Sequence, residues 1–231
     1  MSSAAAAIRS NRAFRIFDAT IVKKAIVAVT GLVMFGFLVG HLAGNLQMFA
    51  GDEGKAIDAY AKFLKSVPEI LWTARVTLLG CVFLHIYFTI QLWKLKGDAR
   101  PQGYVKKDNS HSTFTSKTMY YSGPMLFFFI VYHLLHFTMG IADQANYFEG
   151  EVYKTVVLGF QQPLISGSYI LAMFFLCLHL NHGLYSIWQT LGLTSPRYKP
   201  LQKNGAAVVS IVMFLGFASI PAGVLAGVIH L

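Results

Sequence analysis

The chain has 231 residues, of which 55% are hydrophobic and only 13% are charged, and its mean hydropathy is +0.53. Soluble globular domains carry about 25% charged residues, so this composition excludes that class and indicates an integral membrane protein. The net charge of +9 does not indicate a nucleic-acid-binding protein, because the basic residues alternate from loop to loop along the chain. Cys81 and Cys177 both lie inside apolar runs, so no disulfide framework is implied.

Five apolar runs are long enough to cross a bilayer, so the predicted fold is all-α, a single domain that forms an integral membrane five-helix bundle. The runs are approximately 25–48, 70–93, 118–142, 163–192 and 205–230. Of the 19 Lys and Arg residues, 14 precede the first run or lie between the second and third or the fourth and fifth runs. The other two loops carry seven of the ten acids. The positive-inside rule therefore predicts a cytoplasmic N-terminus and an outer C-terminus, in the cytoplasmic (inner) membrane.

The first run surrounds His41 with glycines, namely Gly31, Gly36, Gly40 and Gly44. The last three are four residues apart. They fit close packing between helices, and they also fit the space that a flat macrocycle needs. Both interpretations can hold together.

The loop between the first two runs is expected to form an amphipathic surface helix, because Asp58, Tyr60 and Phe63 follow helical spacing. Such a helix would cover the outer end of the bundle. Arg75 lies one turn inside the outer end of the second run. Its side chain either reaches the membrane interface or pairs with an anionic group such as a haem propionate.

Histidines inside the runs are the strongest chemical signal. A polar group left unsatisfied in hydrocarbon costs several kcal/mol, so a histidine at that depth needs a partner or a metal. Four of the five runs carry them: His41, His85, the pair His133 and His136, and the pair His179 and His182. Zinc generally takes Cys or carboxylate ligands or an open water position. Opposed histidines from separate helices instead fit haem, whose iron takes two axial ligands.

Depth along the helices predicts which histidines pair. His41 lies 17 residues after Lys24, and His133 lies 16 after Lys117. At about 1.5 Å per residue, both are roughly 24 to 26 Å from the cytoplasmic flank, in an outer plane.

The same calculation places a second pair in an inner plane. His85 lies 16 residues after Glu69, and His179 lies 16 after Pro163. Both are therefore about 24 Å from the outer flank. In a hydrocarbon core about 30 Å thick, the two planes are separated by roughly 15 to 20 Å.

The second histidine of each close pair is an alternative ligand. His136 and His182 lie only about 4.5 Å farther along their helices than His133 and His179, a difference that depth alone does not resolve. The prediction favours His133 and His179. The other two would then hydrogen-bond to a propionate or to a neighbouring helix.

Four pieces of the sequence, in this order, resemble the five-helix, single-chain dihaem cytochrome b anchors of succinate:quinone oxidoreductases, including quinol:fumarate reductases. The pieces are GHLAGN around His41, FLHIYF around His85, VYHLLHFT around His133 and LHLNHGLY around His179. The resemblance covers nearly the whole chain, and the pieces are specific only together. It implies that His41 and His133 bind the distal, outer haem b, and that His85 and His179 bind the proximal, inner haem b.

The resemblance also implies partners. The chain is expected to be the quinone-reactive subunit of a multi-subunit succinate dehydrogenase or fumarate reductase, with an iron–sulfur subunit and a flavoprotein subunit docked on the cytoplasmic side. The dicarboxylate chemistry would belong to a partner subunit. Electrons would pass through the two haems to or from a quinone, and a dihaem anchor suggests menaquinone. Membrane lipid is a further expected partner, nucleic acid is not, and a higher oligomer of the complex stays open.

In this family, quinone chemistry lies near the distal haem and uses an acid before or at the outer end of the second helix. Asp58 and Glu69 are the acids in that region here, with Tyr60 nearby. The prediction slightly favours the Asp58 region. A solvated surface or a helix cap explains either acid as well.

Two other classes of protein remain open from the sequence. A cytochrome b subunit of a hydrogenase or formate dehydrogenase would share the haems and differ in its docking partner. A transporter with intramembrane histidines as a proton relay would bind no haem. An absorbance spectrum separates the last class from the other two.

Overall fold

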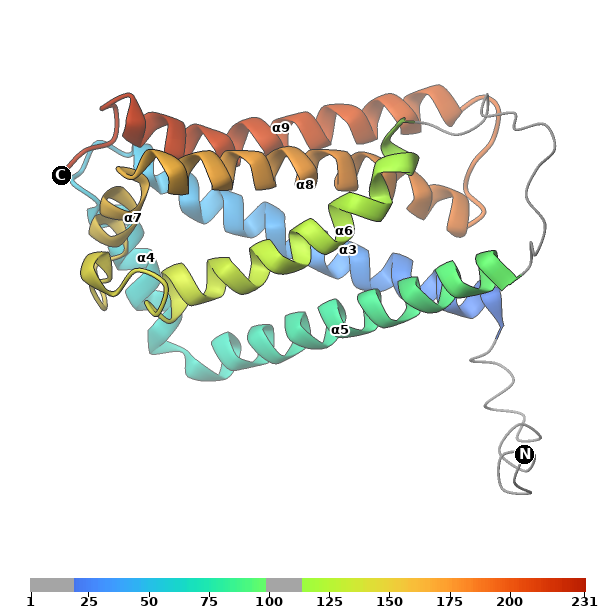
Figure 1. The fold of residues 1–231 in the computed structure, drawn as a ribbon, viewed down its shortest axis with the longest axis horizontal. Coiled ribbons are helices and arrows are strands. Elements are labelled where there is room, and N and C mark those ends of the chain that lie inside the picture. The colour runs from blue at the N-terminus through green and yellow to red at the C-terminus, as the bar shows by residue number, and fades with distance from the viewer. Residues whose placement is uncertain (1–18, 99–113) are drawn as a thin grey trace, which may run out of the picture.

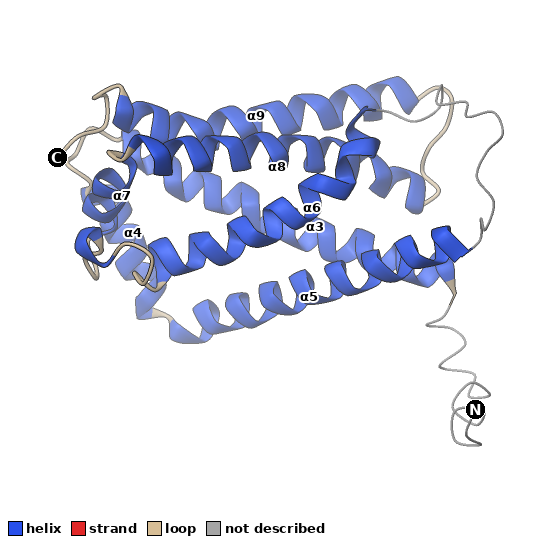
Figure 2. Cartoon of the chain, viewed as in Figure 1, coloured by secondary structure: helices blue, strands red, loops and turns tan. Residues whose placement is uncertain are grey.

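The structure, a computed structural model, describes residues 19–98 and 114–231. Within these ranges every regular element is helical, and five helices are long and apolar enough to cross a membrane, which confirms the predicted fold class (Figure 2). They are α3 (Thr20–Asn45), α5 (Pro68–Asp98), α6 (Phe114–His133), α8 (Pro163–Thr190) and α9 (Lys199–Leu225). The basic residues within 1–18 and 99–113, on which much of the topology prediction depends, lie outside the described residues.

Two of the predicted runs extend past the C-terminal ends of their helices. The third was expected to reach residue 142, but its helical structure ends at Thr138, and the fifth was expected to reach 230, but α9 ends at Leu225. Gly140 (φ 68°) and Gly227 (φ 71°) follow these ends in left-handed conformation. Glycine adopts this conformation without a Cβ clash and commonly terminates helices, although apolar residues continue beyond it.

Helices α3, α8 and α9 form the centre of the bundle. α8 packs against both α9 and α6, and α3 packs against α5, α8 and α9 (Figure 1). The core that joins the three central helices consists of Leu42, Ala172, Met173, Leu176, Leu180 and Met213. Helix α5 lies at the edge against α3 and has no buried residue. An apolar helix this exposed requires lipid around it.

Two short helices close one end of the bundle, which we call the capped end. They are α4 (Lys55–Ser66) and α7 (Val152–Phe160), and the C-terminus lies beside them (Figure 1). The amphipathic helix expected in the first loop is confirmed by α4, in which Ile57 is buried and Phe63 is exposed. Helix α7 was not predicted. Its Val157 is fully buried in a core shared with α4, α8 and α9.

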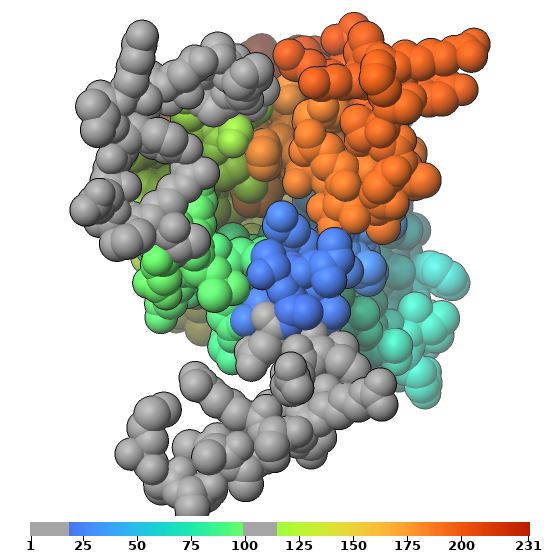
Figure 3. Space-filling model, turned by 90° about the vertical axis from the view of Figure 1, so that its right-hand side faces the viewer, coloured from blue at the N-terminus to red at the C-terminus, as the bar shows by residue number. Residues whose placement is uncertain are grey.

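The opposite end, which we call the open end, carries the start of α3. A view onto it shows this start between the end of α5 and the α8–α9 connection (Figure 3). The described basic residues at this end include Lys94, Lys96, Lys117, Arg197, Lys199 and Lys203.

The capped end depends on a close contact at Gly54. This residue has φ 83°, and a Cβ there would collide with the ring of Tyr153 on α7. Gly51 has a similar φ of 70° but open space around it. We expect Gly51→Ala to lower the free energy of unfolding by about 1 to 2 kcal/mol, the cost of left-handed backbone. Gly54→Ala should cost about 2 to 5 kcal/mol, because overpacking is added.

Thermal unfolding of the two variants in the same detergent measures this difference. Equal midpoints for Gly51→Ala and Gly54→Ala would show that α4 and α7 do not pack through this contact.

Candidate functional site

Histidines from four different helices meet in two pairs. His41 on α3 and His133 on α6 have ring centroids 5.9 Å apart, and His85 on α5 and His179 on α8 have centroids 6.3 Å apart. A metal bound by one nitrogen of each ring, at about 2 Å per bond, places two imidazole centroids about 6 Å apart. The structure thus brings together the same pairs that helix depth predicted.

The two pairs lie at different depths. Three helices each carry a histidine of one pair and, ten or eleven residues away on the same helix, a residue that contacts a histidine of the other pair. These positions are Thr30 and His41 on α3, Ser122 and His133 on α6, and Tyr169 and His179 on α8. At about 1.5 Å per residue, the three helices give separations of about 15 to 17 Å.

The pair nearer the capped end has aromatic surroundings. The Phe37 ring stacks on His41, with centroids 5.3 Å apart, and the Phe129 ring stacks on His133 at 5.8 Å. Tyr169 approaches His133 with its edge, at 6.0 Å. Among the described residues, Nδ1 of His133 is buried and has no hydrogen-bond partner. A buried polar atom without a partner costs about 1 to 3 kcal/mol, so this ring is a candidate ligand.

The pair nearer the open end has polar surroundings. Nδ1 of His85 donates to the backbone carbonyl oxygen of Val27 at 3.1 Å and lies 3.2 Å from Oγ1 of Thr30. A carbonyl oxygen only accepts, so Nδ1 carries the proton and Nε2 of the neutral ring is free to bind a metal. Such outer contacts commonly orient metal-binding histidines.

His179 has a comparable contact, because its Nδ1 lies 3.4 Å from Oγ of the fully buried Ser122. The partners of both histidines were missed from the sequence. Thr30 and Ser122 are 55 and 57 residues away from these histidines along the chain. A single Thr or Ser inside an apolar helix forms no sequence pattern that would indicate such a contact.

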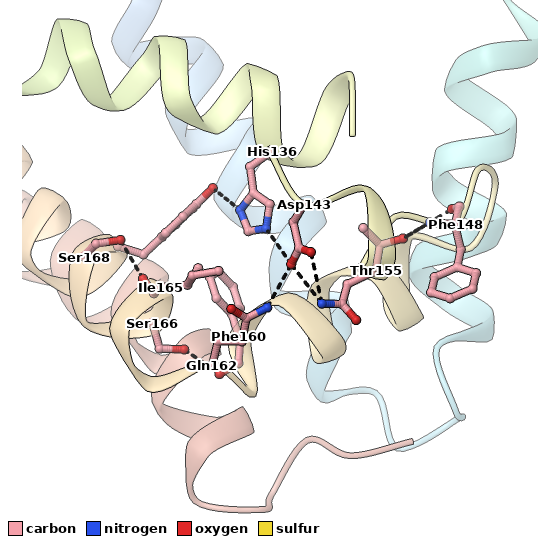
Figure 4. A network of polar contacts seen from close by, with 11 residues as sticks. His136, Asp143, Phe148, Thr155, Phe160, Gln162, Ile165, Ser166 and Ser168 are labelled. Atoms are coloured by element: carbon pink, nitrogen blue, oxygen red, sulfur yellow. Dashed lines mark hydrogen bonds and ion pairs between the residues drawn. The ribbon is translucent and has the colours of Figure 1, made fainter. Parts of the chain in front are cut away.

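His136 occupies a different environment from His133. A π-helical turn, Leu134–Thr138, follows His133 and changes the α-helical spacing at His136. Both rings still contact Tyr169, but their polar contacts differ. His136 is 2% exposed, with Nδ1 3.0 Å from the Tyr169 hydroxyl and Nε2 3.9 Å from Oδ2 of Asp143 (Figure 4). Nδ1 of His136 already has a hydrogen-bond partner and its Nε2 faces the Asp143 carboxylate, whereas Nδ1 of His133 has no partner, so His133 is the better candidate ligand.

His182 and Arg75 lie outside the two histidine pairs. His182 lies partly buried on α8, one turn closer to the open end than His179. The guanidinium of Arg75 is 5.1 Å from the ring centroid of Trp72, whose side chain is exposed on α5. This cation–π contact fits an anchor at the membrane interface.

The three residues predicted for the quinone site, Asp58, Tyr60 and Glu69, make different contacts in the structure. Oδ1 of Asp58 accepts the backbone N–H of Tyr153 at 3.0 Å, which joins α4 to α7. The Tyr60 ring packs on Gly44, where a Cβ would be 2.7 Å away. Gly44 thus serves close packing, whereas Gly36 and Gly40 have open space beside them.

Glu69 lines a groove of about 480 Å³ between α3 and α5. Its other lining residues are Val33, Phe37, Ile70, Thr73, Ala74, Thr77 and Leu78. The ring of Phe37 stacks on His41, so the groove is one side chain away from that histidine pair.

The donor set fits haem better than a bare metal ion. Within residues 19–98 and 114–231, no three His, Cys, Asp or Glu side chains gather where they could hold a metal ion. A haem iron needs only two protein ligands, because the porphyrin supplies four. The two pairs, the orphan Nδ1 of His133 and the open space beside Gly36 and Gly40 fit that requirement.

The fold and the site together define an all-helical, multi-pass membrane protein with two histidine pairs inside its bundle. A family model described as "Succinate dehydrogenase/Fumarate reductase transmembrane subunit" matches residues 100–219. The chain belongs to this family, as the sequence resemblance predicted. Comparisons with curated proteins and with solved structures give no match.

Proposed function

We propose that the chain is the membrane anchor and electron-transfer subunit of a succinate:quinone oxidoreductase, and that it passes electrons between an iron–sulfur subunit and quinone. The observation that carries this proposal is the presence of two histidine pairs about 15 to 17 Å apart in depth. His41 and His133 would hold the outer haem b, and His85 and His179 the inner one. With two histidines holding each group, the haems would supply electron transfer rather than oxygen binding.

The chain's own residues hold and orient the ligand rings. Val27 and Thr30 fix His85, and Ser122 contacts His179. Around the outer pair, stacked phenylalanines exclude water. Rings that are already oriented need little rearrangement when the charge on a bound group changes.

The groove between α3 and α5 is the proposed quinone site. Its volume lies in the range of small-molecule pockets, and its lining is apolar apart from Glu69 and two threonines. Glu69 would exchange protons with the quinone oxygen. Asp58 has less support for that role, because it holds the amide of Tyr153. Tyr60 would act by covering α3 beside His41.

The open end is the proposed docking surface for the iron–sulfur and flavoprotein subunits on the cytoplasmic side. It brings the inner histidine pair closest to them, and complementary charge would orient acidic partners on its basic residues. The capped end would then face outward.

Purification of the complex through a tag on this chain tests the function. We expect flavin and iron–sulfur subunits to copurify, and succinate to reduce bound haem in a manner that depends on them. Copurification of a hydrogenase or formate dehydrogenase subunit instead would favour the rival cytochrome class. A haem-free protein that transports a solute would favour the transporter.

A further inference from the structure

His136 lies at the centre of a polar network behind the outer histidine pair. It follows His133 by three residues, across the start of the π-helical turn. Its Nδ1 is 3.0 Å from the Tyr169 hydroxyl, and the Tyr169 ring contacts His133 itself. His136 therefore touches, through one side chain, the ring that we assign as a haem ligand.

Asp143 connects this histidine to the capped end. Its Oδ2 lies 3.9 Å from Nε2 of His136, and its side chain is only 13% exposed. The side-chain amide groups of Asn146 and Gln162 donate to it at 3.0 to 3.1 Å (Figure 4). All of these donors stabilise a negative carboxylate.

The His136 ring is closely packed on several sides. A Cβ at Gly159 on α7 would lie 3.1 Å from its Nε2, and the Phe137 ring stacks on it with centroids 4.0 Å apart. The π-helical turn itself, the segment that carries Asp143, α7 and α8 thus all contact this imidazole. An intramembrane histidine with this many constraints has a specific role by default.

We propose that His136 and Asp143 are positioning residues for His133: they fix the orientation of its ring through Tyr169, and the Asp143 carboxylate lowers the reduction potential of the group bound there. This inference rests on the proposed function, since it requires a haem on His133. The sign follows from electrostatics, because a nearby negative charge favours the more positive, oxidised form of a redox centre.

The test is a redox titration of the two haems in the purified complex, combined with the low-spin EPR signal of each. Asp143→Asn removes the charge and keeps the shape, and we expect it to raise the midpoint potential of the outer haem while the inner haem stays unchanged. His136→Gln should alter the EPR signal of the outer haem only. The inner haem acts as an internal reference in every sample.

Asp52→Asn provides a matched control. Asp52 is also at the capped end, but it accepts from the backbone N–H groups of Gly54 in its own loop and of Ala56 in the first turn of α4. Its replacement removes the same charge and should leave both potentials unchanged. Tyr169→Phe removes the hydroxyl and keeps the ring against His133, so it should reproduce part of the His136→Gln change in the EPR signal.

Three results would overturn the proposal. One is an unchanged outer haem in both Asp143→Asn and His136→Gln. Another is an equal shift of the potential in Asp143→Asn and Asp52→Asn, which would indicate only long-range charge. The third is loss of the outer haem in both network variants, which would indicate a purely structural role. A wild-type complex without two haems would instead refute the proposed function, so the two failures are distinguishable.

Discussion

Replacement of His179 by Ala is expected to remove the inner haem and leave the outer haem in place. His179 and His85 face each other with ring centroids 6.3 Å apart, and one remaining imidazole does not supply both axial ligands. The outer pair is about 15 Å away along α8 and has its own ligands, so it should be unaffected. His85→Ala should give the same result.

The measurement is haem content per chain together with a redox titration, in which one of two components should disappear. His182→Ala is the matched variant, since it removes the other histidine of the same helix. It should retain both components. Loss of the inner component in His182→Ala but not in His179→Ala would assign the ligand to His182, and loss of the outer component in His179→Ala would show that the pairing is wrong.

The second large effect concerns the quinone. Glu69→Gln is expected to lower quinone-linked turnover by about 10²- to 10⁴-fold, the usual contribution of a general acid or base. Succinate oxidation with an artificial acceptor should stay at the wild-type rate, because the proposed function assigns that reaction to partner subunits. Both haems should remain, since Glu69 lies in the groove outside the two histidine pairs.

Asp58→Asn separates the two candidate acids. The amide oxygen of Asn can still accept the Tyr153 N–H, so the contact between α4 and α7 should survive. We expect nearly full quinone activity. A large loss in Asp58→Asn with full activity in Glu69→Gln would move the proton carrier to Asp58, and full activity in both would exclude either carboxylate.

The fold was largely predictable because apolar runs of membrane length force helices wherever backbone groups meet hydrocarbon. The histidine pairs followed from a constant rise per residue, which converts sequence position into depth. That calculation has a resolution of about one turn. It therefore left His133 and His136 undecided, although the structure gives them different environments.

Features that depend on contacts between distant segments were not predictable. The π-helical turn after His133 and the short helix α7 have no distinctive sequence pattern. The contacts of His136 with Tyr169 and Asp143 join a helix to a loop and to another helix. Glu69 is a better candidate for the quinone site than Asp58 because it lines the groove between α3 and α5. This groove forms only when those helices pack, so the sequence alone did not indicate it.

The central claim is that each histidine pair holds one haem b, and the haem content of the purified chain tests it most directly. Quantitative haem extraction, with a reduced-minus-oxidised absorbance spectrum of the same sample, should give two haems b per chain, both low-spin. One haem per chain, or none, would contradict the account.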